Sequence, residues 1–161
     1  MKNIVIFASG SGSNAEKIIE HFKQSDQVTI THIFCNNPTA GVIEKAARLQ
    51  IPCSIFSREE YKNGTVLRKI QSLQTDWIIL AGFLWLVPSE YVQAYPQRII
   101  NLHPALLPKF GGKGMYGHFV HEAVVEAGEK ESGITIHFVN EHYDEGGIIF
   151  QSSFAINPSD T

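Results

Sequence analysis

Apolar runs of strand length alternate with amphipathic segments of helix length from the N-terminus to residue 102. The apolar runs predict strands at residues 3–8, 28–35, 52–56, 76–81 and 98–102, and the amphipathic segments predict helices at residues 15–23, 41–50, 65–73 and 88–94. Strands and helices that alternate in this way form right-handed crossovers in a parallel sheet. We therefore expect an α/β fold with a mostly parallel sheet and, because the strands are continuously apolar, helices on both of its faces.

The pattern changes towards the C-terminus. A glycine-rich loop is predicted at residues 105–117, a helix at 118–127, and two further strands at 132–139 and 148–156. Because a short connection joins the last two strands, we expect antiparallel pairing at the C-terminal end of the sheet. Residues 157–161 have the composition of a helix start, so we expect a single domain over residues 1–161 that lacks a C-terminal helix.

Residues 132–139 alternate between apolar and polar side chains. Ile134, Ile136 and Phe138 form an apolar stripe, whereas Thr135 and His137 share the opposite face. Successive side chains of a strand point to opposite faces of the sheet. His137 is therefore a further candidate for a functional histidine.

The composition argues against several classes of protein. A chain of 161 residues that is 43% apolar suits one globular domain. A net charge of −3 without a long basic run argues against a nucleic-acid binder, and the apolar runs are too short to span a bilayer. Cys35 and Cys53 lack metal-ligand spacing and read as reduced thiols. We expect a cytoplasmic protein with no metal, nucleic-acid or membrane partner, since the N-terminus leads directly into a strand.

A glycine-rich hexapeptide, residues 9–14 (SGSGSN), joins the first predicted strand to the first helix. Its glycines allow close approach of the backbone, and a helix N-terminus offers N–H groups to an anion. The G-x-G-x-x-A spacing from Gly10 also fits a dinucleotide fingerprint, but residues 35–37 (CNN) lack the acid that would hold a ribose. We therefore favour phosphate binding, aided by the Ser13 and Asn14 side chains, over a nicotinamide cofactor. A glycine-rich turn without a ligand is the alternative.

Asn101 and His103 lie two residues apart at the end of the fifth predicted strand. Pro104 ends this strand because proline has no N–H for the ladder. The period of two sends both side chains to the same face, at the edge where open α/β sheets bind ligands. An amide and an imidazole that titrates near neutral pH are thus predicted to point into a cleft. The alternative is a histidine that is satisfied by a local backbone group.

Two other segments are candidates for function. The apolar residues 81–87 follow the fourth strand and could line a pocket for a flat heteroaromatic ligand, although a core loop fits them equally well. Asp144 lies in an acidic turn at residues 143–147, and alone it reads as a turn residue. Next to His103, its carboxylate would favour the imidazolium form and could move protons.

With these residues assembled, the chain resembles the phosphoribosylglycinamide formyltransferases, the folate-dependent enzymes of purine synthesis. The matching motifs are residues 4–14, 81–83, 101–108 (NLHPALLP) and 133–147, and the resemblance covers nearly the whole chain. It implies a Rossmann-like formyltransferase fold. It also implies transfer of the formyl group from 10-formyltetrahydrofolate to the amine of glycinamide ribonucleotide, without a metal. A homodimer stays open as the oligomeric state.

The resemblance also implies roles for particular residues. The catalytic residues would be Asn101, His103 and Asp144, and the ribonucleotide phosphate would be bound by Gly12, Ser13 and Asn14. The folate would be bound by Arg58, Leu84, Trp85, Leu86, Val87, Asn101, Asn140, Glu141 and Tyr143. The chain departs from the family pattern at Trp85, where relatives often have a basic residue, and in a longer loop at residues 111–117.

Other functions remain open alternatives. A formyltetrahydrofolate deformylase usually has an N-terminal regulatory domain, but here the first strand is predicted to begin at Asn3. A methionyl-tRNA formyltransferase would need a basic C-terminal domain for tRNA. A phosphate-binding module without catalysis would not need Asn101, His103 and Asp144 together.

Overall fold

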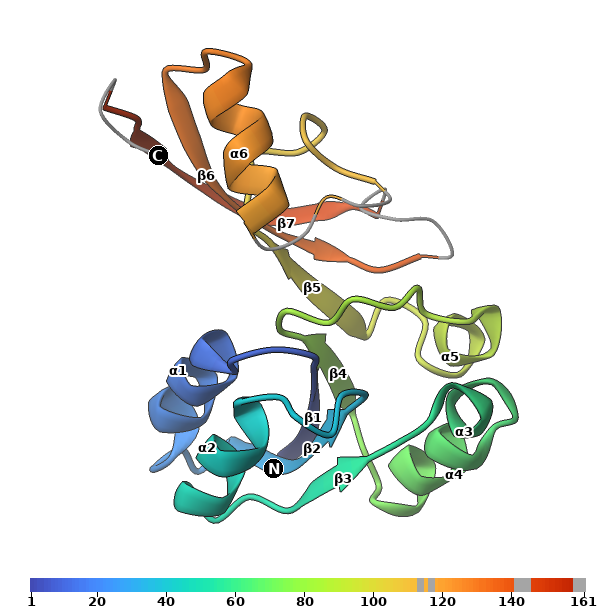
Figure 1. Ribbon diagram of the computed structural model, residues 1–161. Coiled ribbons are helices and arrows are strands. Elements are labelled where there is room, and N and C mark those ends of the chain that lie inside the picture. Colours follow the sequence, from blue (N-terminus) through green and yellow to red (C-terminus); the bar gives the residue numbers. More distant parts are fainter. Residues whose placement is uncertain (113–114, 116–117, 141–145, 158–161) are drawn as a thin grey trace.

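The computed structural model describes residues 1–112, 115, 118–140 and 146–157 and contains one sheet with the strand order β3-β2-β1-β4-β5-β6-β7 (Figure 1). The strands are β1 (Lys2–Ala8), β2 (Val28–Cys35), β3 (Cys53–Ile55), β4 (Trp77–Leu80), β5 (Ile99–His103), β6 (Glu131–Phe138) and β7 (Ile148–Ala155). The strands β1 to β5 are parallel to one another, and β6 and β7 are antiparallel to their neighbours. The predicted fold class is confirmed.

Helices pack on both faces of the parallel part of the sheet. They are α1 (Ser13–Phe22), α2 (Val42–Arg48), α3 (Arg58–Lys62), α4 (Thr65–Ser72) and α5 (Ser89–Ala94), whereas α6 (His118–Glu126) lies beside β6 and β7 and packs against Ala105 (Figure 1). On β1, Ile4 and Ile6 face α1 and α2, whereas Val5 and Phe7 face α3, α4 and α5. A strand that is buried on both faces has to be apolar throughout, which explains the continuous apolar run of β1.

Helix α3 was not predicted, because five residues are too few to show a helical period. A local signal for it exists in the sequence. The Ser57 hydroxyl accepts a hydrogen bond from the Glu60 backbone N–H, and the Glu60 carboxylate accepts one from the Ser57 N–H. This reciprocal capping box satisfies two amide groups that would otherwise lack partners at the helix start.

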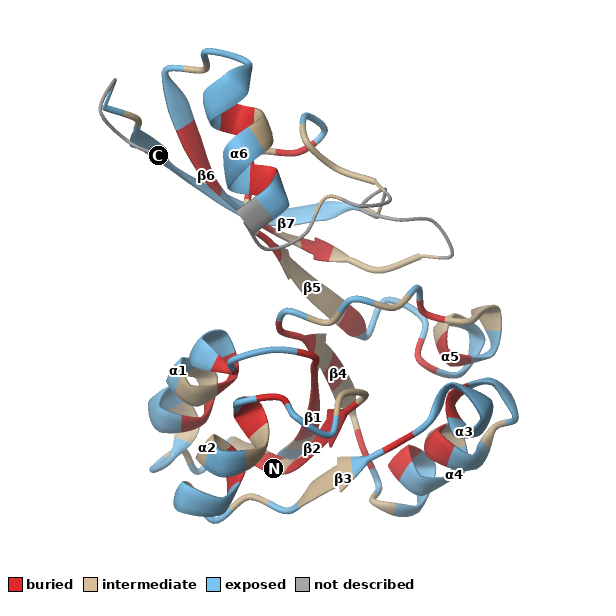
Figure 2. Ribbon diagram, viewed as in Figure 1, coloured by how far each residue is buried: buried red, intermediate tan, exposed pale blue. Residues whose placement is uncertain are grey.

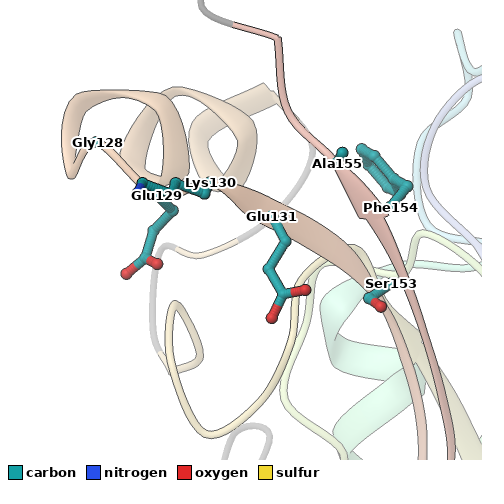
Figure 3. Close-up of a pocket in the computed structure, with 7 residues that line it drawn as sticks. All are labelled: Gly128, Glu129, Lys130, Glu131, Ser153, Phe154 and Ala155. Carbon is teal, nitrogen blue, oxygen red and sulfur yellow. The ribbon is translucent and has the colours of Figure 1, made fainter.

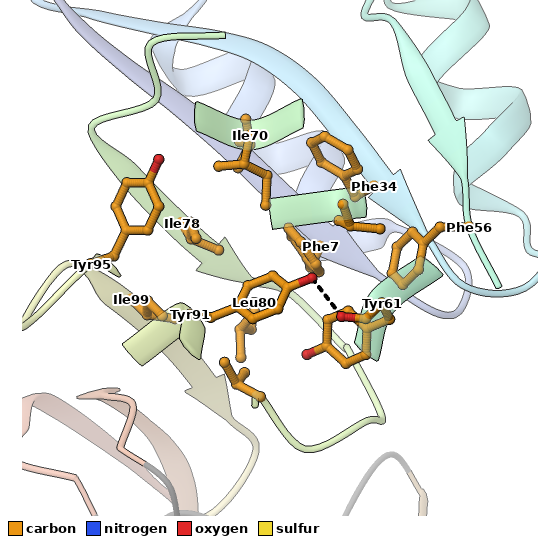
Figure 4. Packing of buried hydrophobic residues seen from close by; sticks show 13 residues of the cluster. Phe7, Phe34, Phe56, Tyr61, Ile70, Ile78, Leu80, Tyr91, Tyr95 and Ile99 are labelled. Atoms are coloured by element: carbon orange, nitrogen blue, oxygen red, sulfur yellow. Dashed lines mark hydrogen bonds between the residues drawn. The ribbon is translucent and has the colours of Figure 1, made fainter. Parts of the chain in front are cut away.

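The larger core lies between the sheet and the helices α3, α4 and α5 (Figure 4). Phe7 is 1% exposed and stacks on Phe34, with 5.2 Å between the ring centroids. Tyr61 and Tyr91 also pack in this core, where the Tyr91 hydroxyl donates to the Tyr61 carbonyl oxygen at 3.0 Å. Burial of one such aromatic side chain contributes about 1.5–3 kcal/mol to the free energy of unfolding. Packing on this face of the sheet therefore stabilises the arrangement of β1, β4 and β5.

On β6 the polar face is buried and part of the apolar face is exposed, although an apolar stripe usually marks the buried face. Thr135 and His137, on the polar face, are 0% and 1% exposed, whereas Ile134 on the apolar face is 40% exposed. The polar face is the covered one because Thr135 is bonded to the backbone of the loop that follows β5. Strand β7 is at the edge of the sheet, and all its residues are exposed (Figure 2). In the described part of the chain, no helix has the length and apolar character needed to cross a bilayer.

Candidate active site

The predicted phosphate loop lies between β1 and α1. Gly12 is the N-cap of α1 in a left-handed conformation (φ +76°), and no side chain caps this helix. A Cβ atom at Gly12 would lie 2.5 Å from Cγ2 of Val42, so the close packing of α2 also requires glycine here. Ser13 and Asn14 follow in the first turn, and both are exposed. The first N–H groups of a helix have no partner within the helix and attract anions, so this end of α1 suits a phosphate.

The segment after β4 exposes some of its apolar side chains and buries others. Leu84 and Leu86 are 41% and 42% exposed, whereas Val87 is 5% exposed and belongs to the core. The Tyr61 hydroxyl donates to the Leu86 carbonyl oxygen at 3.2 Å. The burial of Val87 matches the core-loop alternative, and the ligand pocket stays a prediction. Leu84 and Leu86 are available to a ligand, and Val87 anchors the segment in the core.

Arg58 and Trp85, both predicted to contact folate, lie against each other. The guanidinium carbon of Arg58 is 4.3 Å from the centroid of the Trp85 ring. Trp85 also packs edge-on against Phe56, with centroids 5.9 Å apart, and is tilted against Tyr61 at 5.6 Å. The aromatic cluster orients the indole, and the cation–π contact places a positive charge over its ring.

Asn101 and His103 occupy the carboxyl end of β5, as predicted, and point to the same face of the sheet as Ile99. In the antiparallel register, Asn101 lies opposite His137, and His103 lies opposite Thr135. The His137 Nδ1–H donates to the Phe138 carbonyl oxygen at 2.9 Å. Its Nε2 is then the acceptor for the Asn101 amide Nδ2, at 3.1 Å. His137 thus fixes which end of the Asn101 amide carries the donors.

His103 is 3% exposed, and its Nε2 lies 2.7 Å from the carbonyl oxygen of Phe110. A carbonyl oxygen only accepts, so Nε2 carries a proton and donates it. Thr135 ties the intervening loop to β6. Its hydroxyl donates to the Ala105 carbonyl oxygen at 2.7 Å and accepts the Leu107 N–H at 3.1 Å. The backbone contact of His103 matches the alternative raised from the sequence, but this contact also leaves the ring as a hydrogen-bond donor.

Several predicted site residues fall outside the described part of the chain. Asp144, Glu141 and Tyr143 are among them, so the predicted meeting of Asp144 with His103 stays a prediction. Asn140 is described, lies just after β6, and is half-buried. The described part of the predicted set thus lies on the loops that leave β1, β4 and β6, in the first turn of α1, at the end of β5 and on α3.

Two cavities lie away from most of these residues. One, of about 630 Å³, is a wide depression between the end of α6 and the paired ends of β6 and β7 (Figure 3). It is lined by Gly128, Glu129, Lys130, Glu131, Ser153, Phe154 and Ala155. The other, of about 220 Å³, lies beside the loop that contains Leu107 and Phe110. Neither cavity is lined by a residue predicted to be catalytic or to bind a ligand, so volume alone does not identify the active site.

The sequence identified His137 only as a candidate, and it indicated no role for Thr135 or Ser9 as anchors. For His137 and Thr135, the available signal was their position on the polar face of the predicted strand. For Ser9, a serine directly after a buried strand, the sequence held no signal of its partner, because that partner is Leu84, far along the chain.

The chain matches the family model described as "Formyl transferase" over residues 2–161. It is 44% identical to the chloroplastic phosphoribosylglycinamide formyltransferase of Arabidopsis thaliana, over 99% of this chain and 57% of that protein. It is 36% identical to the phosphoribosylglycinamide formyltransferase of Bacillus subtilis, over 100% of this chain and 83% of that protein. The chain spans only 57% and 53% of the two plant relatives, from Arabidopsis and Vigna unguiculata.

Solved structures show the same similarity. The phosphoribosylglycinamide formyltransferase of Bacillus halodurans superimposes with a TM-score of 0.89 at 34% identity, over 99% of this chain and 83% of that chain. The glycinamide ribonucleotide transformylase 1 of Geobacillus kaustophilus gives a TM-score of 0.88 at 36% identity, over 100% of this chain and 86% of that chain. The chain is therefore similar to phosphoribosylglycinamide formyltransferases in both its sequence and its fold.

Proposed function

Since this chain belongs to the formyl transferase family, we propose that it transfers the formyl group of 10-formyltetrahydrofolate to the amine of 5′-phosphoribosylglycinamide, a step of purine biosynthesis. The observation that carries this proposal is the placement of Asn101 and His103 at the end of β5, on the same edge of the sheet as the phosphate loop after β1. That edge is where open α/β sheets bind ligands. The names of the relatives indicate the acceptor of the reaction, and the family indicates that the transferred group is a formyl group.

In the proposed reaction, the amine of the ribonucleotide attacks the formyl carbon, and a tetrahedral intermediate with an oxyanion forms. Asn101 and His103 donate hydrogen bonds to this oxyanion. The bond between Asn101 and His137 supports this role, because it presents the NH₂ end of the amide rather than its oxygen. One donor of this kind is typically worth ~10²–10³ in rate.

The Nε2–H group of His103 already has a hydrogen-bond acceptor in the structure. Its Nε2–H is held by the neutral carbonyl of Phe110. A charged oxyanion is a stronger acceptor than a neutral carbonyl, so it competes for this proton when it forms. Asp144 would hold the imidazole in its charged form and, through water, help to move the amine proton to the leaving nitrogen. General acid–base assistance of this type contributes ~10²–10⁴.

The two ligands would occupy different loops. The ribonucleotide phosphate would bind at Gly12, Ser13 and Asn14, where the uncapped helix start supports an anion. The folate would be bound by residues 84–87, Asn101, Asn140, Glu141 and Tyr143. The guanidinium of Arg58, held over Trp85, would face its negatively charged tail.

One assay tests the proposal. The purified protein is mixed with 10-formyltetrahydrofolate, with and without glycinamide ribonucleotide, and the formation of tetrahydrofolate and of the formylated product is followed. We expect formylated product only when both substrates are present. Release of formate in the sample without ribonucleotide, at the same rate, would instead indicate a deformylase. Binding of both ligands without any turnover would indicate a module that is not catalytic.

A further inference from the structure

The loop after β1 and the loop after β4 are joined at one buried residue, Ser9. β1 and β4 are parallel neighbours, so the two loops leave the sheet side by side (Figure 1). Ser9 is 5% exposed. Its backbone N–H donates to the Gly82 carbonyl oxygen at 3.1 Å, and its hydroxyl oxygen accepts the Leu84 N–H at 3.1 Å. Ser9 is therefore bonded to both ends of a short stretch of the second loop.

The same residue begins the phosphate loop. The Ser9 carbonyl oxygen accepts a hydrogen bond from the Asn37 side chain at 3.5 Å, and the Gly10 carbonyl oxygen accepts the Val42 N–H at 3.1 Å. The loop is thus fixed to the sheet and to α2 on one side, and to residues 82–84 on the other. A change in the loop backbone at Ser9 would move the Leu84 amide, since one short side chain links the Ser9 hydroxyl to the backbone.

We propose that Ser9 is a positioning residue that couples the two ligand loops, so that occupation of the phosphate loop changes the affinity of residues 84–87 for the folate. This inference rests on the proposed function for the identity of the two ligands. Its physical basis is that coupling between two sites needs an element whose position both sites bias. Ser9 is such an element, because its hydroxyl bonds one loop and its backbone forms part of the other.

Coupling is reciprocal, so it is measured from either ligand. Calorimetry would give the Kd of glycinamide ribonucleotide, first alone and then with saturating tetrahydrofolate, which has no formyl group to transfer. The ratio of the two values is the coupling factor. The variants are Ser9→Ala, which removes the hydroxyl, and Ser9→Thr, which keeps it. Ser11→Ala is the matched control, because Ser11 lies in the same loop but is exposed.

In the wild type and in Ser11→Ala we expect a coupling factor on the order of tenfold, within the usual range for linked sites. In Ser9→Ala we expect a factor near one, with the Kd of the ribonucleotide alone changed by less than about threefold, and in Ser9→Thr we expect recovery. A wild-type factor of one, or the same factor in Ser9→Ala as in the wild type, would overturn the proposal.

A second measurement does not depend on the substrates. Hydrogen–deuterium exchange of the Leu84 amide would be followed before and after addition of inorganic phosphate. We expect phosphate to slow this exchange in the wild type and in Ser11→Ala but not in Ser9→Ala. If phosphate leaves the wild-type exchange unchanged, Ser9 does not couple the loops. If phosphate slows it while the formyl-transfer assay finds no product, the coupling stands and the proposed function fails.

Discussion

Asn101 and His137 face each other across the antiparallel pair of β5 and β6, with the amide Nδ2 3.1 Å from the imidazole Nε2. The other ring nitrogen of His137 is held by the Phe138 carbonyl oxygen, so the ring is fixed at both ends. A histidine on one strand thereby orients an amide on its neighbour.

Replacing either donor on β5 should slow the chemistry and leave ligand binding nearly intact. For Asn101→Ala and for His103→Ala we expect a fall in kcat of ~10²–10³, because each is proposed to stabilise charge that exists only in the transition state. Steady-state kinetics and calorimetry of both ligands check this. Wild-type turnover by either variant would remove that residue from the mechanism.

His137→Ala should lower kcat by ~10–10², since the Asn101 donor remains but its position is no longer fixed. His121, an exposed residue of α6, provides a matched control, and His121→Ala should be neutral. The double variant Asn101→Ala/His137→Ala should be no slower than Asn101→Ala alone, because His137 acts through Asn101. Additive losses would show that His137 has an independent role.

The phosphate loop should control the binding of the ribonucleotide and not that of the folate. Asn14→Ala removes an exposed donor and should weaken ribonucleotide binding roughly tenfold or more, as for a hydrogen bond to a charged group, while tetrahydrofolate binding stays unchanged. Gly12→Val is a poor test, because its side chain would meet Val42 and its backbone has a positive φ. For Gly12→Val we expect a lower Tm. Equal loss of both ligands in Asn14→Ala would mean a misplaced site.

Trp85 should report on folate binding. The chain has two tryptophans, so Trp77→Phe leaves Trp85 as the only one, and its fluorescence should change when tetrahydrofolate is added. In this background, Arg58→Ala should weaken tetrahydrofolate binding by up to about fivefold, because an exposed charge pair contributes little. Ribonucleotide binding should not change. An unchanged emission spectrum at saturation would place the folate elsewhere.

The two cysteines should react slowly in the folded protein. Burial raises the pKa of Cys35, and burial together with the neighbouring Cys35 raises the pKa of Cys53 to about 11. The native protein should be alkylated by iodoacetamide much more slowly at pH 8 than the denatured protein, because the thiolate is the nucleophile. Since both folded pKa values lie above the unfolded ones, the associated stability is present below about pH 8.5 and is lost as the pH rises towards 11. Equal alkylation rates in the native and denatured proteins would contradict this.

The sequence determined the order and type of most elements and the location of two candidate loops. β2 occupies the predicted residues 28–35, and β5 ends at His103, directly before the proline that cannot continue a ladder. Periodicity, proline and glycine act over a few neighbouring residues, so these features can be read from the chain alone. Position 12 requires glycine because its φ is positive. The sequence indicates this position, because the glycine lies between a predicted strand and a predicted helix.

Only the tertiary structure decided which surfaces are buried and which side chains meet. The alternation in β6 shows that its two faces differ, but the face covered is the one that holds Thr135 and His137, because the loop after β5 bonds to Thr135. The contacts Asn101–His137, Arg58–Trp85 and Ser9–Leu84 each join residues that are distant in the chain. Strand order and register bring such residues together, and both depend on how all the helices and strands pack at once.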